Sequence, residues 1–235
     1  MLFMFKKGLN DGIAIALGYL SVSFTFGLIA VSGGLSTTQA VLISFLCLTS
    51  AGQFAGLDIM IAGGSLIELA LSQVVINLRY SLMSISLSQK ADETLNIPSR
   101  LLIGYGITDE IFAVAMSKNK TIGRTYMAGL ISLPVLGWTL GTLLGALIGN
   151  VIPPLLSESL GIAIYAMFLA IIIPPAKEEK GVVAVLITAI IGSCLIYYTP
   201  LSKVITSGFK VIIMGILASV VGAVFFPKNE DEEEA

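Results

Sequence analysis

Two neighbouring carboxylates stand inside an otherwise apolar run, in the stretch ITDEIFAV from Ile107 to Val114. A charged side chain in hydrocarbon costs about 2.5–3.5 kcal/mol even on the mildest scale, so such residues persist where they face a cavity, a partner or a solute. Burial and mutual repulsion favour the protonated form of one member of the Asp109–Glu110 pair. The pair is therefore a candidate for accepting and releasing a proton.

A purely structural interpretation of the same acids stays open. Gly104-Tyr105-Gly106 can end a helix, and Thr108 is a good N-cap for the next one. Asp109 and Glu110 would then lie in the first helical turn, where the helix dipole favours acids by about 0.3–1 kcal/mol.

One arginine lies in the apolar stretch from Glu68 to Ser86. At about 100° per residue, a helix here is polar on two opposite sides. One side holds Gln73, Asn77, Ser81, Ser84 and Ser88, and the other holds Glu68, Ser72, Arg79 and Ser86. The forked guanidinium of Arg79 requires a carboxylate, which a substrate or an internal ion pair with Asp109 or Glu110 would supply. Asn77 and Arg79 are thus candidates for a solute pathway.

An amide lies in the small-residue stretch AGQFAGLD, Ala51 to Asp58. Two glycines near Gln53 predict a helix interrupted at Ala51-Gly52-Gln53, a device by which transporters expose backbone groups to substrate. The alternative is a tight helix crossing in which Gln53 bonds a neighbouring helix. The pattern leaves open the roles of Asp58 and Glu68.

The elements that position these residues must be membrane helices. Of the 235 residues, 56% are hydrophobic and 12% charged, about half the charged fraction of an average soluble domain. Runs without Asp, Glu, Lys or Arg extend over 12–57 and 125–157, each longer than the ~20 residues that span a bilayer. We expect an all-α, polytopic protein with about eight apolar segments, some broken or re-entrant. They are 12–31, 39–61, 64–88, 100–117, 125–149, 159–175, 181–198 and 209–226.

These segments predict one transmembrane transporter domain over 1–228, followed by an acidic cytoplasmic tail over 229–235. Glycines at four-residue spacing, including Gly141 and Gly145, predict close helix packing. The glycines of the first and fifth segments also suggest a weak internal duplication.

The positive-inside rule favours cytoplasmic termini in a cell-membrane protein. With eight spans, the inner side collects Lys6, Lys7, Lys118, Lys120, Arg124, Lys177, Lys180 and Lys228. The outer side receives Lys90, Arg100, Lys203 and Lys210.

Four motifs stand in order along the chain: AGQF, NLRY, TDE and GWTLGTLLG. Together with LGYLSVSFTFGLIA, they resemble the azaleucine-resistance (AzlC-type) branched-chain amino acid permeases over nearly the whole chain. This chain departs from the family pattern at Ala51-Gly52, where Ser-Ala is usual, and at Tyr80, where His is frequent. A coupling role for that histidine cannot apply here, because the chain has no histidine.

The resemblance implies export of branched-chain amino acids, usually with a small hydrophobic AzlD-type subunit. It places Gln53, Asn77, Arg79, Asp109 and Glu110 on or near the pathway. Because carboxylates are the evident titrants and no GxxxxGK[ST] motif is present, we expect proton coupling. We expect no catalytic residues, cofactor, metal site or nucleic-acid partner. A channel or scaffold subunit is the alternative, and a membrane-embedded enzyme is disfavoured because no nucleophile–base pair is evident.

Overall fold

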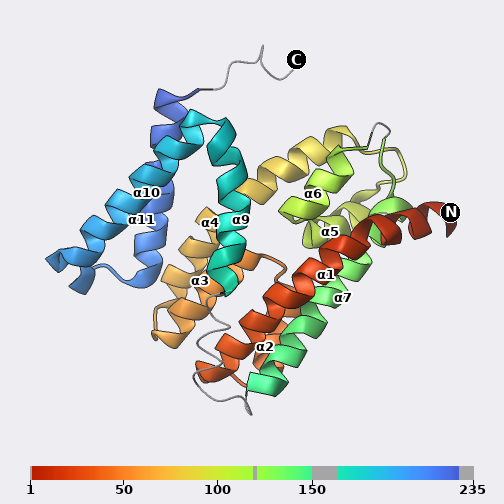
Figure 1. Ribbon diagram of the computed structural model, residues 1–235. Coiled ribbons are helices and arrows are strands. Elements are labelled where there is room, and N and C mark those ends of the chain that lie inside the picture. Colours follow the sequence, from red (N-terminus) through yellow and green to blue (C-terminus); the bar gives the residue numbers. More distant parts are fainter. Residues whose placement is uncertain (1, 119–120, 150–162, 228–235) are drawn as a thin grey trace. The chain divides into compact units, whose positions relative to one another are not determined.

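The computed structural model describes residues 2–118, 121–149 and 163–227, which form α-helices without a β-strand (Figure 1). Within these ranges, five helices are long and apolar enough to cross a membrane: α1 (Leu2–Ser32), α4 (Leu66–Gln89), α7 (Arg124–Gly149), α10 (Lys180–Tyr198) and α11 (Ser207–Phe225). The expected class, an all-α polytopic membrane protein, is confirmed. The expected tail over 229–235, and the start of the segment 159–175, lie outside the described residues.

The chain divides into two compact units. Unit 1 comprises Met1–Phe54 and Asn77–Ile164, and unit 2 comprises Ala55–Ile76 and Tyr165–Ala235. The five residues predicted for the pathway all belong to unit 1, so the arrangement of that unit determines their surroundings.

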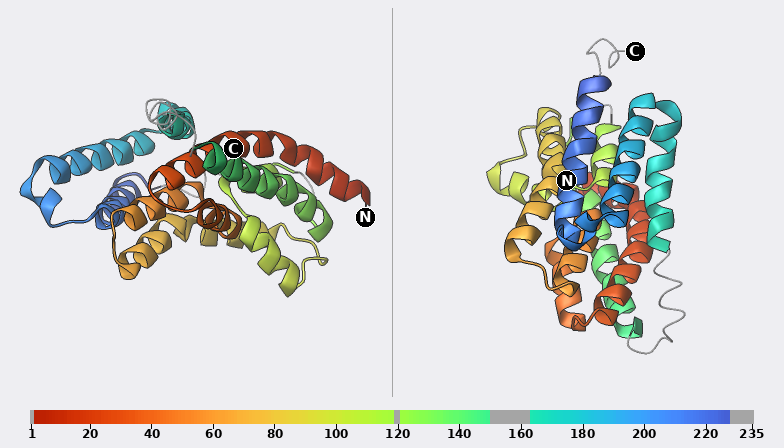
Figure 2. Two further views of the ribbon diagram at one scale, coloured as in Figure 1. Left: turned by 90° about the horizontal axis from the view of Figure 1, so that it is seen from below. Right: turned by 90° about the vertical axis from the view of Figure 1, so that its left-hand side faces the viewer.

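Unit 1 is built on α1 and α7, which run parallel and side by side (Figures 1 and 2). A Cβ built on Gly12 would lie 2.7 Å from the Leu130 carbonyl oxygen, and one on Gly137 would lie 2.5 Å from that of Ala16. Gly141 and Gly145 lie in the same way against the backbone at Leu20 and Phe24. Side chains at these positions would separate the helices, so glycine permits backbone-to-backbone packing.

The first broken hairpin enters unit 1 from the end at which α1 finishes. Helix α2 (Thr37–Leu46) begins with a capping box between Ser36 and Gln39, and α3 (Ser50–Ile61) follows after a break at 47–49. At the break, Leu48 packs with Tyr19 and Trp138, halfway along α1. The chain then returns, because Phe54 packs edge-on against Phe26 at a centroid distance of 5.3 Å. The first part of the segment 39–61 is therefore a hairpin and not a single crossing helix.

The second broken hairpin enters from the opposite end. Helix α5 (Ile97–Gly106) begins beside the start of α7, where Ser99 and Arg124 line one groove. The chain breaks at Ile107–Thr108, and α6 (Asp109–Met116) leads back until Lys118 pairs with Asp11 at 2.8 Å. Helices of ten and eight residues are only about 15 and 12 Å long, so neither spans a hydrocarbon core of about 30 Å. The chain thus reverses within the segment 100–117, which is the geometry of a re-entrant hairpin.

The two breaks meet at Tyr19. Leu48 packs against this side chain from the first hairpin, and Thr108 contacts its hydroxyl from the second. The predicted interruption of the helix at Ala51-Gly52-Gln53 is wrong, because the break lies at 47–49 and α3 begins at Ser50. Those residues are helical: Gln53 N donates to the Thr49 carbonyl at 2.7 Å in the first turn of α3. The small residues beside Gln53 permit close helix packing, and the Gln53 side chain bonds the neighbouring helices.

The second hairpin also corrects the predicted assignment of basic residues to the two sides of the membrane. Ile122 N donates to the Lys90 carbonyl at 3.0 Å, and Lys90 Nζ donates to the Met116 carbonyl at 2.5 Å. Lys90 and Arg100 therefore lie at the same end of unit 1 as Lys6 and Lys118, not opposite them. We call this the basic end: the end of unit 1 at which α1, α5 and α7 begin and α4 and α6 finish.

Unit 2 contains α9 (Ala163–Glu178), α10, a short 3-10 turn (Pro200–Lys203) and α11. Helices α10 and α11 pack antiparallel, with Gly222 facing Val185 and Gly192 facing Met214. The Glu68 carboxylate, 2% exposed, accepts from Gly208 N at 2.8 Å and from the Thr206 hydroxyl. Glu68 thus caps the start of α11, which has no side-chain cap of its own. The question left open for Glu68 has a structural answer.

Candidate functional site

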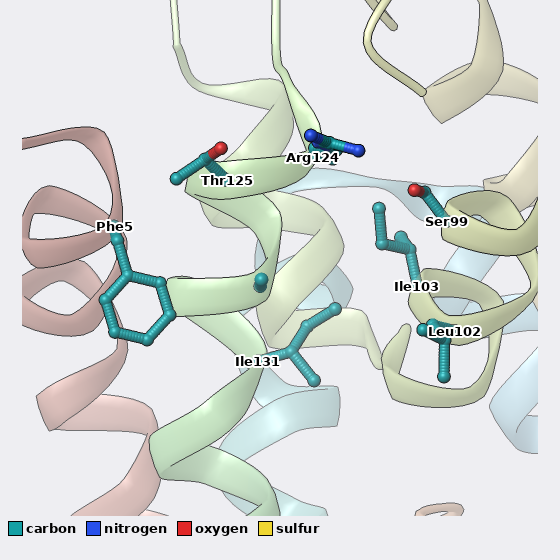
Figure 3. A pocket seen from close by; sticks show the side chains of 8 residues that line it. Phe5, Ser99, Leu102, Ile103, Arg124, Thr125 and Ile131 are labelled. Carbon is teal, nitrogen blue, oxygen red and sulfur yellow. The ribbon is translucent and has the colours of Figure 1, made fainter. Parts of the chain in front are cut away.

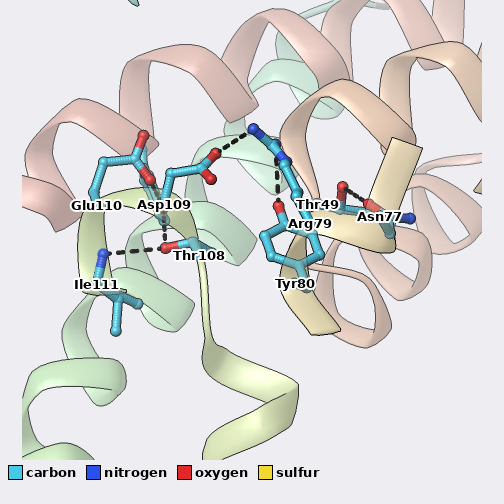
Figure 4. Close-up of polar contacts among 9 residues, drawn as sticks. Thr49, Asn77, Arg79, Tyr80, Thr108, Asp109, Glu110 and Ile111 are labelled. Carbon is cyan, nitrogen blue, oxygen red and sulfur yellow. Dashed lines mark hydrogen bonds and ion pairs between the residues drawn. The ribbon is translucent and has the colours of Figure 1, made fainter. Parts of the chain in front are cut away.

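An ion pair joins the two charged motifs halfway along unit 1. Arg79 Nη1 lies 2.7 Å from Asp109 Oδ2, and both side chains are 45% exposed (Figure 4). Arg79 also contacts Tyr80, its guanidinium carbon 5.1 Å from the ring centroid. Asp109 is held at the first turn of α6, and Arg79 comes from the second half of α4. The internal ion pair considered from the sequence is therefore present, and it is open on one side.

The neighbouring carboxylate turns to different partners. The Tyr19 hydroxyl lies 2.5 Å from Glu110 Oε2 and 2.6 Å from Thr108 Oγ1. A phenol has a single proton, so Tyr19 donates to Glu110 while its oxygen accepts from Thr108. Thr108 is also the N-cap of α6 and accepts from Ile111 N at 3.4 Å. The two acids of the TDE motif therefore have separate roles: Asp109 meets a cation and Glu110 meets a hydroxyl.

Asn77 lies two residues before Arg79 on α4, on the opposite side of the helix, and contacts the first break. The Thr49 hydroxyl donates to Asn77 Oδ1 at 2.5 Å (Figure 4). Thr49 directly precedes α3, so this bond ties the first hairpin to the helix that carries Arg79. The Ser50 Oγ beside it is buried and has no hydrogen-bond partner among the residues that the structure describes. Polar groups of both breaks thus gather around one stretch of α4.

Gln53 lies deeper and is fully bonded. Its amide nitrogen donates to Ser44 Oγ at 2.5 Å, and its oxygen accepts from Trp138 Nε1 at 3.0 Å. Ser44 in turn lies 2.6 Å from Thr142 Oγ1, and the Gln53 side chain is 3% exposed. Gln53 therefore links α2, α3 and α7, as the tight-crossing interpretation describes.

The structure brings together Asn77, Arg79, Asp109 and Glu110. It connects Gln53 to them through Trp138, whose ring packs edge-on against Tyr19 at 5.2 Å. Tyr19 and Thr49 complete the site, and motif reasoning missed both. Tyr19 is the one tyrosine in the first apolar segment, and Thr49 stands two residues before the AGQF motif. Their positions were the one indication in the sequence that they belong to the site.

This arrangement offers one exposed cation, one exposed anion and a second carboxylate with a hydroxyl partner. Within the described ranges, no three His, Cys, Asp or Glu residues are grouped as metal ligands would be. Cys47 and Cys194 are free thiols. Asp58 has an exposed side chain in unit 2. The chemistry available at the site is ion pairing and proton exchange.

Comparison with known proteins finds the family that the sequence motifs resemble, over more than half of the chain. The family described as "AzlC protein" matches residues 14–152. An "Uncharacterized membrane protein" of Archaeoglobus fulgidus is 33% identical over 176 residues, which cover 74% of this chain and 77% of that protein. The "Inner membrane protein YgaZ" of Escherichia coli is 29% identical over 200 residues, 81% of this chain and 82% of its own.

A transport protein with a named substrate class is also similar. The "Branched-chain amino acid transport protein AzlC" of Bacillus subtilis is 22% identical over 179 residues, covering 75% of this chain and 69% of its own length. No solved structure matches the chain. The family match extends over more than half of the sequence and includes every residue of the site. The chain therefore belongs to the AzlC family of membrane proteins.

Proposed function

We propose that this protein is a secondary transporter that exports branched-chain amino acids across the cytoplasmic membrane. The observation that carries the proposal is the half-exposed Arg79–Asp109 pair, placed where two broken hairpins meet halfway along α1 and α7. Irregular backbone at membrane depth is tolerated where it is buried in protein or lines a water-filled cavity. Charged residues at that depth belong to solute and ion pathways by default.

The ion pair supplies both groups that a zwitterion needs. An amino acid carboxylate replaces Asp109 on the forked guanidinium of Arg79, and its ammonium replaces Arg79 on Asp109. The pair and the zwitterion are each neutral, so the exchange brings no net charge to membrane depth. The branched side chain is left to apolar contacts, which agrees with the substrate class in the name of the Bacillus subtilis relative.

Glu110 is the proton carrier in this proposal. It lies beside Asp109 but is bonded to Tyr19 and not to Arg79, so one protonatable group stays available when the zwitterion occupies the ion pair. Inward proton movement would then drive outward movement of substrate. The export direction and a small AzlD-type partner come from the resemblance to azaleucine-resistance permeases.

Leucine transport in reconstituted liposomes tests the proposal. Removing one charge of the pair, by Arg79→Gln or Asp109→Asn, should lower radiolabelled leucine flux at least about tenfold, which corresponds to about 1.4 kcal/mol of lost binding. The matched control is the other ion pair of unit 1, Asp11–Lys118, at 2.8 Å. Asp11→Asn should leave the flux within about twofold, because this pair lies at the basic end and not at the breaks.

A charge-exchanged variant separates binding from folding. Arg79→Asp combined with Asp109→Arg keeps an ion pair but exchanges the positions of its charges. Restored flux in this double variant would show that the pair is merely structural. Full flux in either single variant would show that transport does not need the pair. Flux that does not saturate with leucine, with or without an AzlD-type subunit, would favour the channel or scaffold alternative.

A further inference from the structure

A groove opens between α1, α5 and α7 at the basic end, away from the transport site. It has a volume of about 400 Å³ and is lined by Phe5, Ser99, Leu102, Ile103, Arg124, Thr125, Ala128 and Ile131 (Figure 3). Leu102 is 72% exposed, so the groove lies on the outer surface of unit 1. Helices α1 and α7, which form two of its walls, are candidate membrane spans. We therefore expect lipid around the groove.

The lining has a polar rim and an apolar interior. The rim is formed by Ser99, Arg124 and Thr125, which come from the first turns of α5 and α7. About one to two turns further along these helices, the walls are Ile103 and Ile131. A ligand that fits has a polar head at the helix starts and an apolar chain that follows the helices inward.

The charge at the rim selects the head group. Among residues 2–118, 121–149 and 163–227, no carboxylate lies within 4.0 Å of the Arg124 guanidinium, whereas Lys118 is paired with Asp11. The Arg100 Nε donates to the Leu95 carbonyl and Lys90 Nζ to that of Met116. Arg124 is thus an exposed cation above an apolar groove. Its fork suits a phosphate, and its charge favours a head group with net negative charge over a zwitterionic one.

The side of the membrane agrees with this head group. Lys6, Lys7, Lys90, Arg100, Lys118 and Arg124 all belong to the basic end. The positive-inside rule makes that end cytoplasmic, and the cytoplasmic leaflet carries the anionic lipids. An acyl chain gains no hydrophobic free energy by leaving other chains, so selectivity for a lipid arises at its head group.

From these observations, we propose that the groove between α1, α5 and α7 binds an anionic phospholipid. The phosphate lies at Arg124 with the hydroxyls of Ser99 and Thr125, and an acyl chain lies along Leu102, Ile103 and Ile131. The site is separate from the Arg79–Asp109 pair, so it stands independently of the proposed transport function.

Native mass spectrometry of the purified protein, titrated with equal amounts of phosphatidylglycerol and phosphatidylcholine, tests the site. The wild type should retain phosphatidylglycerol preferentially. Arg124→Gln should lower that retention about fivefold or more, since a basic residue in direct contact with an anionic head group contributes a factor of this order. Ala128→Trp, which fills the groove without changing charge, should lower retention of both lipids.

Lys6→Gln is the matched control, because it removes the same charge from an exposed position of the basic end outside the groove. It should retain phosphatidylglycerol like the wild type. Equal retention of the two lipids by the wild type, or equal loss in Lys6→Gln and Arg124→Gln, would overturn the proposal. Arg124 is exposed, so circular dichroism should show a fold unchanged by its substitution.

Discussion

At Asp109 and Glu110 the backbone places two adjacent carboxylates in different surroundings. Asp109 pairs with Arg79 at 2.7 Å, and Glu110 accepts from Tyr19 at 2.5 Å. Their helix position alone would explain the presence of acids, since both lie in the first turn of α6. It does not explain a partner cation on α4 or a buried tyrosine on α1. Because of these contacts, the two acids form a candidate functional site in addition to stabilising the start of α6.

Glu110→Gln tests the assignment of the proton to this residue. Glutamine keeps an oxygen that accepts from Tyr19 but cannot release a proton, so leucine exchange across liposomes should persist while acceleration by a pH gradient is lost. Both are measured in the same preparation, by counterflow and by an imposed gradient. Tyr19→Phe removes only the hydroxyl and should weaken both without uncoupling them. A Glu110→Gln protein that is still driven by the gradient would refute the assignment.

Among the elements, the parallel pair α1 and α7 determines the geometry of everything else in unit 1. Both hairpin breaks contact Tyr19 of α1, and the first also packs against Trp138 of α7. The two rings pack edge-on against each other. A shift between the two helices would therefore displace both breaks. The glycines that let these helices touch act on the site at a distance.

Gly145→Ala measures that effect. A Cβ on Gly145 would overlap the Phe24 carbonyl oxygen, whereas one on Gly18, also within a helix, meets nothing within 4 Å. We expect Gly145→Ala to destabilise the protein by about 1–3 kcal/mol through overpacking. Gly18→Ala should be neutral or stabilising by up to about 1 kcal/mol, because it reduces backbone freedom of the unfolded chain. Thermal unfolding in detergent compares them, and equal midpoints would contradict backbone contact between α1 and α7.

The elements also show how much of this structure the sequence could predict. Apolar length predicted the helices, and the Thr108 N-cap with Gly104-Tyr105-Gly106 before it predicted where α6 begins. The first break was predicted several residues late, because the small residues around Gln53 were interpreted as an interruption. They instead allow a continuous helix to pack closely, with Gln53 bonded to Ser44 and Trp138. The Tyr19–Glu110 contact joins residues 91 apart, which no local pattern encodes.

On the scale of the whole molecule, the re-entrant α5–α6 hairpin changes which loops share a side. An eight-span count alternates sides after every apolar segment, so it separates residue 93 from residue 121. The contact of Ile122 with Lys90 places these loops together at the basic end, while the α1–α2 turn lies at the opposite end of unit 1. Unit 1 thus presents nearly all its basic residues to one side, which strengthens the bias that fixes membrane orientation.

Single-cysteine labelling tests this topology in cells. In a background with Cys47→Ser and Cys194→Ser, an impermeant maleimide added outside should label Thr38→Cys, which is exposed in the first turn of α2. Glu93→Cys and Thr121→Cys, also exposed, should both react only after the membrane is opened, because the positive-inside rule predicts a cytoplasmic basic end. The decisive comparison is between residues 93 and 121. If Glu93→Cys reacts from outside together with Thr38→Cys, the segment 100–117 crosses the membrane, and the meeting of two half-helices at Tyr19 is lost.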